Sequence, residues 1–80
     1  MNISSEYEDV FIAVVCSTCG RKYFLTKETD ARIAGLCGSV DFKDRIHYIE
    51  KNVRCCTNRH YLWMPPMRYL GRDDVEFLEF

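Results

Sequence analysis

The chain has 80 residues, so we expect a single domain over residues 1–80. A hydrophobic core of this size stabilises a fold only marginally, so we also expect an additional stabilising cross-link. Hydrophobic residues form 48% and charged residues 29% of the chain, a globular composition that excludes a disordered or low-complexity protein. The formal net charge of −1 also excludes a global basic field that would recruit nucleic acid or anionic lipid.

The first half of the chain has the pattern of a β-hairpin followed by a helix. Residues 7–15 are rich in β-branched side chains, and residues 21–25 return as a second strand after a tight Cys-Ser-Thr-Cys-Gly turn. Thr26 can cap a helix over residues 27–37 through its side-chain oxygen, and Gly38 is placed to end that helix.

The stretch of residues 41–52 is compatible with two structures. The spacing of its apolar residues predicts a helix, because one helix face would carry Phe42, Ile46, Ile49 and Val53. Residues 45–53 can also extend as a strand. Of the two alternatives we favour the helix.

The remainder of the chain predicts short strands. Residues 53–56 lead as a strand into a second cysteine-containing turn, and residues 61–64 leave that turn as another strand. Pro65 and Pro66 end this strand, because proline cannot donate to a strand ladder. Residues 75–80 form an edge strand or stay loose until a partner covers them.

The five cysteines indicate metal binding rather than disulfide bonds. Their number is odd, and the acidic start of the sequence lacks the pattern of a secretory signal, which indicates a cytoplasmic protein. The longest apolar run near the start, residues 10–15, is too short to span a membrane. In a reducing compartment, clustered cysteines are more often metal ligands than disulfide partners.

Cys16 and Cys19 have the two-residue separation with which a tight turn presents two ligands to one zinc ion. Gly20 strengthens this prediction, because the chain must turn sharply after the second ligand, often with a positive φ. The spacing therefore predicts half of a zinc site at the tip of the expected hairpin.

The second half of the predicted site is less regular. Either Cys55 or Cys56 can pair with His60, and adjacent residues rarely point to the same ion. Cys37, which we expect to be a core thiol, enters one further alternative, in which the ligands are Cys16, Cys19, Cys37 and Cys56.

The order Cys-x-x-Cys-Gly, aromatic strand, helical middle and Cys-x-Asn-x-His resembles the small zinc-ribbon-like proteins that are common in bacteriophage genomes. The resemblance covers residues 10–61, and in its second turn Thr57 replaces the usual proline and Arg59 the usual glycine. It implies a small α+β, zinc-ribbon-like fold in which short antiparallel strands carry two zinc-binding turns, with one or two short helices between them. It also implies one structural zinc ion per chain. The implied ligands are Cys16, Cys19, Cys56 and His60.

Enzymatic activity is not expected of such a site. Four protein ligands close the coordination shell, whereas a catalytic zinc keeps one position open for water. The His-x-Glu of zinc deaminases and the His-Glu-x-x-His of metalloproteases are both absent from the sequence. The sequence resembles the zinc-supported histidine-asparagine-histidine nucleases only weakly, because it lacks the polar residues that precede their metal turn.

A protein is the expected partner of this domain. The residues around the two prolines belong to types that are enriched in interface cores. They are Tyr61, Trp63, Met64, Met67 and Tyr69. The resemblance adds the expectation that the chain is phage-encoded and modulates or inhibits a host protein machine in the bacterial cytoplasm.

Nucleic acid is the alternative partner, in which case the chain would be a zinc-ribbon regulator. The residues available to phosphates flank the two turns and are Arg21, Lys22, Arg54 and Arg59. Solvated surface charge explains these side chains equally well. The sequence leaves the oligomeric state open.

Overall fold

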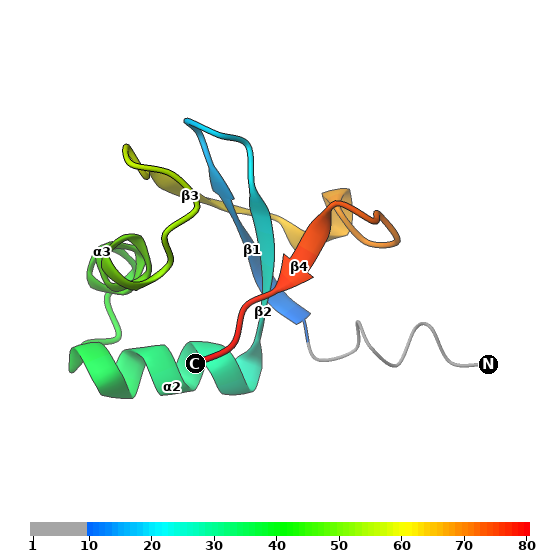
Figure 1. The fold of residues 1–80 in the computed structure, drawn as a ribbon. Coiled ribbons are helices and arrows are strands. Elements are labelled where there is room, and N and C mark those ends of the chain that lie inside the picture. Colours follow the sequence, from blue (N-terminus) through cyan, green and yellow to red (C-terminus); the bar gives the residue numbers. More distant parts are fainter. Residues whose placement is uncertain (1–9) are drawn as a thin grey trace.

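The computed structural model describes residues 10–80, which form a small α+β structure with a four-stranded mixed sheet and two α-helices (Figure 1). The strands are β1 (Val10–Cys16), β2 (Lys22–Thr26), β3 (Tyr61–Met64) and β4 (Val75–Phe77). The helices are α2 (Lys27–Cys37), α3 (Phe42–Asn52) and the short 3-10 helix η1 (Pro66–Arg68). None of these helices has the length and apolar character needed to cross a membrane.

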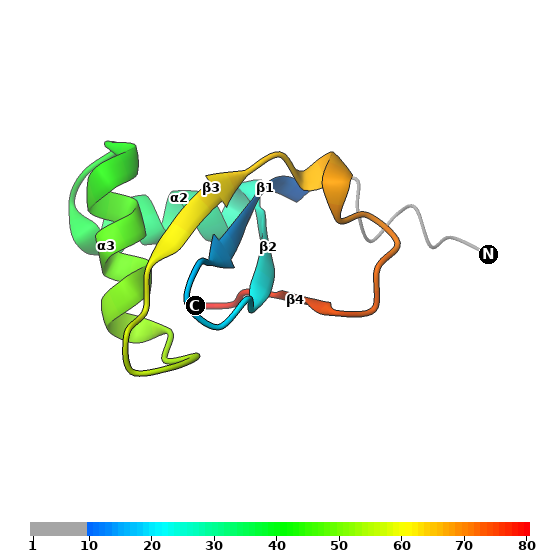
Figure 2. The same ribbon diagram turned by 90° about the horizontal axis from the view of Figure 1, so that it is seen from above.

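The strands lie in the order β3-β1-β2-β4. β1 pairs antiparallel with β2 on one edge and with β3 on the other, while β4 runs parallel to β2. Seen from above, α3 lies beside β3, and β4 lies at the opposite edge (Figure 2). Because β1 is central, side chains on both of its faces are covered: Val14 belongs to one hydrophobic cluster and Ala13 to the other.

α2 begins and ends at its predicted capping residues, and a side-chain cap also starts α3. The Thr26 hydroxyl accepts a hydrogen bond from the Thr29 N–H at 3.1 Å, and Gly38 closes α2 with a left-handed φ of 73°. The Asp41 carboxylate accepts a bond from the Lys43 N–H at the start of α3. The helix over residues 27–37 is therefore confirmed, and for residues 41–52 the helix rather than the strand is confirmed.

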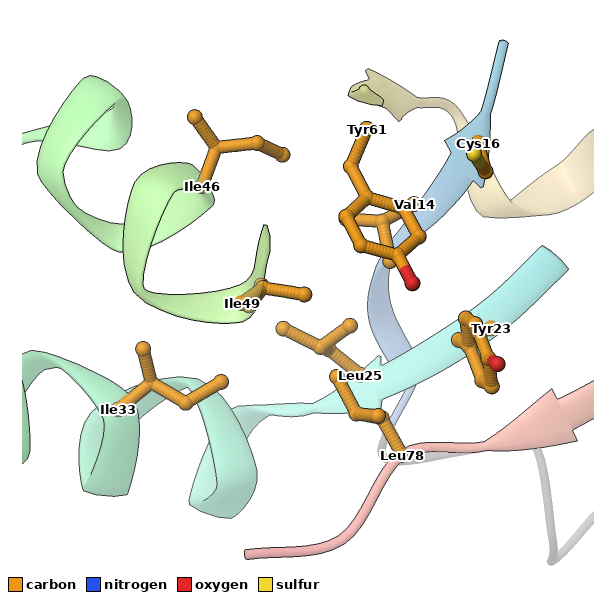
Figure 3. Packing of buried hydrophobic residues seen from close by; sticks show 9 residues of the cluster. All are labelled: Val14, Cys16, Tyr23, Leu25, Ile33, Ile46, Ile49, Tyr61 and Leu78. Carbon is orange, nitrogen blue, oxygen red and sulfur yellow. The ribbon is translucent and has the colours of Figure 1, made fainter. Parts of the chain in front are cut away.

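The larger hydrophobic cluster lies between the helices and one face of the sheet (Figure 3). Ile33 of α2 and Ile49 of α3 are fully buried against Val14 and Leu25 of the central strands. Burying each such side chain contributes about 1.5–3 kcal/mol. This cluster also includes Cys16, so one end of the core merges with the cysteine-containing turns.

The other face of the sheet carries a smaller cluster. Ala13 of β1 and Phe24 of β2 pack there with Tyr69, which the segment after η1 folds over them. The Phe24 and Phe77 rings are 5.4 Å apart and tilted by 53°, which joins β4 to β2. The segment from residue 65 to residue 74 therefore covers part of this face and delivers β4 to the edge of the sheet.

Several strand predictions hold and one is wrong. β3 and the edge strand β4 lie where residues 61–64 and 75–80 predicted them, although β4 ends at Phe77. Residues 53–56 form no strand and bend at residues 55–56, because they lead directly from the end of α3 into the turn before β3 and pair with no strand among residues 10–80. Residues 7–9 of the first predicted strand lie outside the described part of the chain.

Candidate metal centre

Two turns meet at one end of the sheet. The first joins β1 to β2, and the second joins α3 to β3 (Figures 1 and 2). Hydrogen bonds tie one turn to the other, since the Ser17 N–H and hydroxyl both donate to the His60 carbonyl, at 2.8 and 3.1 Å. The Thr18 hydroxyl donates to the Asn58 carbonyl at 2.6 Å. The two turns are thus held together by the protein itself.

Four cysteine sulfurs converge between these turns. The Sγ atoms of Cys16, Cys19, Cys55 and Cys56 all lie within 4.8 Å of one another. The Cys16 and Cys56 sulfurs are 3.8 Å apart, and the Cys55 and Cys56 sulfurs are 3.9 Å apart. A tetrahedral zinc site with Zn–S bonds of about 2.3 Å has sulfur–sulfur edges of about 3.8 Å. This four-cysteine cluster therefore fits the size of a tetrahedral thiolate site for one metal ion.

The local backbone explains how the first turn presents its sulfurs. Cys16 is the last residue of β1 and is fully buried, whereas Cys19 is exposed at the tip of the turn. The Gly20 N–H donates to the Cys16 carbonyl at 2.8 Å, and Gly20 has a φ of 83°. The positive φ predicted after the second ligand is therefore confirmed, and glycine is the residue that adopts it without strain.

Three of the four predicted ligands belong to the four-cysteine cluster, namely Cys16, Cys19 and Cys56. The fourth member is Cys55 rather than His60. Adjacent cysteines were expected to diverge, but the chain bends at residues 55–56 and both sulfurs face the first turn. Metal binding by the predicted set remains a prediction.

His60 lies on the outer side of the second turn. Its side chain is 69% exposed, and its Nδ1 atom is 4.0 Å from the Glu50 carboxylate of α3. Its role in the described structure comes from its backbone, because its carbonyl accepts the two bonds from Ser17.

Cys37 lies away from the four-cysteine cluster. It ends α2, and its thiol donates to the carbonyls of Ala34 and Ser39 at 3.7 and 3.4 Å. The alternative ligand set that includes Cys37 thus does not come together in the described structure.

Arg59 anchors the second turn to α3. Its Nε donates to the Glu50 carbonyl in the last turn of the helix, and its Nη1 donates to the Cys56 carbonyl at 2.9 Å. The last carbonyls of a helix have no partners within the helix, so a cationic donor there satisfies an acceptor and complements the helix dipole. The nucleic-acid alternative placed Arg59 at a phosphate, and no local pattern in the sequence indicates this anchoring role.

The cysteines of the cluster differ in acidity. Burial acts to raise the pKa of the Cys16 thiol, but hydrogen bonds from the backbone of His60 and Cys19 outweigh it and lower the pKa from 9.0 to about 6. Burial raises the pKa of the Cys55 thiol to about 12. Thiolates crowded into one site repel one another, and a bound metal cation would offset this repulsion.

Tyr61 contacts the cluster from the core. It is 3% exposed, its ring packs edge-on against Tyr23 with centroids 6.1 Å apart, and its hydroxyl lies 3.1 Å from the Cys55 sulfur. Among the residues assigned to a partner surface, Tyr61 and Tyr69 are both buried. The period-two alternation of β3 could have indicated this for Tyr61, because Trp63 on the same face packs against Phe42 of α3.

The predicted basic residues are mostly engaged within the chain. The Arg21 guanidinium is 3.9 Å from the Glu76 carboxylate, and the Lys22 Nζ is 3.3 Å from the Asp74 carboxylate. These acidic partners come from β4 and the segment before it. Their position beside the first turn follows from the parallel pairing of β4 with β2, which the sequence pattern does not contain.

The fold and the site define a small α+β domain whose four-cysteine cluster has the composition and size of a metal-thiolate centre. Comparison with protein families, curated proteins and solved structures finds no match to this chain.

Proposed function

We propose that the chain is a non-enzymatic domain in which one structural zinc ion, bound by the four-cysteine cluster, supports a surface that binds a protein partner. The observation that carries the proposal is the convergence of four sulfurs within 4.8 Å at the junction of two turns. Sulfur ligands in a tetrahedral arrangement favour zinc or iron over magnesium and calcium, which take oxygen ligands. Four thiolates also close the shell of a zinc ion, which is the mark of a structural site.

A protein partner is supported by the distribution of exposed apolar side chains. In the segment from residue 61 to residue 70, Met67 is 81% exposed, Leu62 46% and Leu70 41%. Methionine adapts its shape to a partner and is enriched at such surfaces. We therefore assign the partner surface to this segment, with Met67 as its most accessible side chain.

The nucleic-acid alternative is supported less well. Arg21 and Lys22 pair with acidic residues, and Arg59 donates to backbone carbonyls, so three of the four predicted phosphate ligands already have acceptors. Arg54 is exposed and available to a phosphate. Among the four predicted contact residues, one available arginine provides little of the counterion release from which nucleic-acid affinity arises.

The test combines affinity capture with a salt titration. Zinc-loaded protein is used to capture partners from a bacterial lysate, since the resemblance predicts a host protein machine, and its binding to DNA and RNA is measured as salt increases. We expect a specific protein to be retained at high salt and nucleic-acid binding to be absent. Nucleic-acid affinity that falls steeply with salt would instead support the alternative.

A pair of variants makes the capture experiment specific to the proposed surface. Met67→Asp places a charge in the segment assigned to the partner, whereas Val40→Asp changes an apolar side chain that is 82% exposed between α2 and α3. We expect Met67→Asp to abolish capture and Val40→Asp to preserve it. Equal capture by the two variants would contradict the assignment of the surface.

A further inference from the structure

The Tyr61 hydroxyl faces two acceptors. It lies 3.1 Å from the Cys55 sulfur and 3.1 Å from the Val53 carbonyl oxygen. The side chain comes from β3, whereas both acceptors belong to the bend after α3. Tyr61 is therefore a direct connection between the hydrophobic core and the four-cysteine cluster.

A phenol carries one proton, so Tyr61 can donate fully to only one of these acceptors. While Cys55 is a thiol, its own S–H can donate to the Tyr61 oxygen, and the Tyr61 proton can then serve the Val53 carbonyl. When a metal ion binds, the Cys55 proton leaves to solvent and the sulfur becomes a thiolate acceptor. A charged acceptor attracts a donor more strongly than a neutral carbonyl does.

We infer that Tyr61 is a positioning residue of the metal centre, whose hydroxyl donates to the Cys55 thiolate when the cluster binds its metal ion. This inference rests on the proposed four-thiolate site. Hydrogen bonds to ligand atoms orient the ligands and stabilise their charge, and their loss typically weakens metal affinity by about 10–100-fold. Tyr61 would thereby hold Cys55, rather than His60, in the coordination shell.

The choice of Cys55 over His60 gains a physical reason from this contact. The Cys55 sulfur has a buried donor within reach, whereas the His60 side chain is 69% exposed and faces Glu50. A thiolate at Cys55, which is half-buried against the apolar core, would be costly without such a donor. The Tyr61 hydroxyl reduces that cost in the metal-bound state.

The test is Tyr61→Phe, which removes the hydroxyl and preserves the ring that packs against Tyr23. Co²⁺ serves as the probe, because its thiolate charge-transfer bands report on the sulfur ligands. We expect Co²⁺ affinity to fall by about 10–100-fold. We also expect the charge-transfer bands to move to longer wavelength at saturating Co²⁺, because a sulfur that has lost a hydrogen bond gives up an electron more easily.

Tyr23→Phe is the matched control. Tyr23 is 7% exposed and packs against the same ring, but its hydroxyl makes no hydrogen bond to a cluster sulfur in the described part of the chain. We expect its bands to match those of the wild-type protein. A destabilised fold lowers affinity without moving the bands of the saturated site, so the bands separate a positioning role from a merely structural one.

The outcomes distinguish this inference from the proposal beneath it. If wild-type protein shows no thiolate charge-transfer bands with Co²⁺, both the metal centre and the role of Tyr61 are wrong. If wild-type protein shows them and Tyr61→Phe leaves their position unchanged, the role of Tyr61 alone is wrong, whatever happens to the affinity.

Discussion

Cys55 is the residue at which the described structure and the sequence pattern differ most. The pattern Cys-x-Asn-x-His points to Cys56 and His60, but the sulfur that joins Cys16, Cys19 and Cys56 is that of Cys55. Cys55 is half-buried and His60 is exposed on the outer side of the turn. A metal ion that prefers sulfur ligands would thus find four sulfurs within reach at this position, without an imidazole.

The two candidate ligands can be separated by substitution. We expect Cys55→Ser to lower zinc affinity at least tenfold, because a neutral hydroxyl replaces a thiolate ligand. His60→Gln should keep about one zinc ion per chain. Zinc content after dialysis against a competing chelator measures both. Loss of zinc in His60→Gln with retention in Cys55→Ser would restore the ligand set that the sequence pattern implies.

At the scale of elements, the second turn depends on its attachment to α3. Arg59 bridges the Glu50 carbonyl and the Cys56 carbonyl, and the Glu50 carboxylate accepts the Tyr61 N–H at 3.0 Å. One end of α3 is therefore connected to both sides of the turn. This attachment places Cys55 and Cys56 against the first turn.

Removing this attachment should lower the stability of the fold measurably. We expect Arg59→Ala to lower the free energy of unfolding by about 1–3 kcal/mol, because hydrogen bonds from a charged donor are lost and a helix-end carbonyl is left without its partner. Arg54→Ala is the control, since Arg54 is exposed and makes no hydrogen bond or ion pair that is recorded among residues 10–80. Denaturant unfolding of the zinc-loaded variants measures the difference, and equal stability of the two would contradict the role of Arg59.

The two α-helices are joined by a buried ion pair. The Arg45 guanidinium of α3 donates to the Asp30 carboxylate of α2, with side chains only 8% and 14% exposed. Arg45 also lies over the Phe42 ring, 4.4 Å from its centroid. The pair links α3 to α2, and α3 leads into the second turn.

Removing one partner of this ion pair should destabilise the fold strongly. We expect Asp30→Ala to lower the free energy of unfolding by about 3–5 kcal/mol, because it leaves a buried guanidinium without its counter-charge. Glu28→Ala removes the exposed pair with Arg32 and should change stability by less than about 1 kcal/mol. Thermal unfolding followed by circular dichroism compares the two variants, and similar losses in both would contradict this account.

At the scale of the whole molecule, the four-cysteine cluster and the hydrophobic core are one structure. Cys16 belongs to the larger hydrophobic cluster, and Cys55 and Cys56 pack against it. In a chain of 80 residues, a metal ion bound by this cluster would add a large free energy of binding to a small core. The junction of the two turns should therefore respond first when the metal ion is removed.

Chelation tests this coupling. We expect removal of zinc to lower the unfolding temperature and to speed the hydrogen exchange of the amides of β3 and the two turns. The amides in the middle of α2 should remain protected from exchange. Hydrogen exchange followed residue by residue measures this, with re-addition of zinc as the control for reversibility. Uniform loss of protection along the chain would show instead that the whole fold requires the metal ion.

Local sequence signals accounted for much of the fold. The caps at Thr26 and Gly38 and the spacing of apolar residues in α3 are properties of neighbouring residues, and each predicted its element correctly. Residues 53–56, which bend at residues 55–56, were predicted as a strand because their composition permits one. A strand also requires that the segment lie alongside a partner strand, which no local pattern reports.

The sequence by itself determined the elements of the hairpin and helices, the tight turn that carries Cys16 and Cys19, and the positive φ at Gly20. Each of these features depends on residues that are near neighbours in the chain. Only the tertiary structure decided that Cys55 completes the four-cysteine cluster and that Tyr61 lies behind it. These features depend on how α3 delivers the second turn to β1, through contacts between residues far apart in the chain. The spacing therefore predicted a cysteine site at the first turn, and packing selected the four sulfurs that converge there.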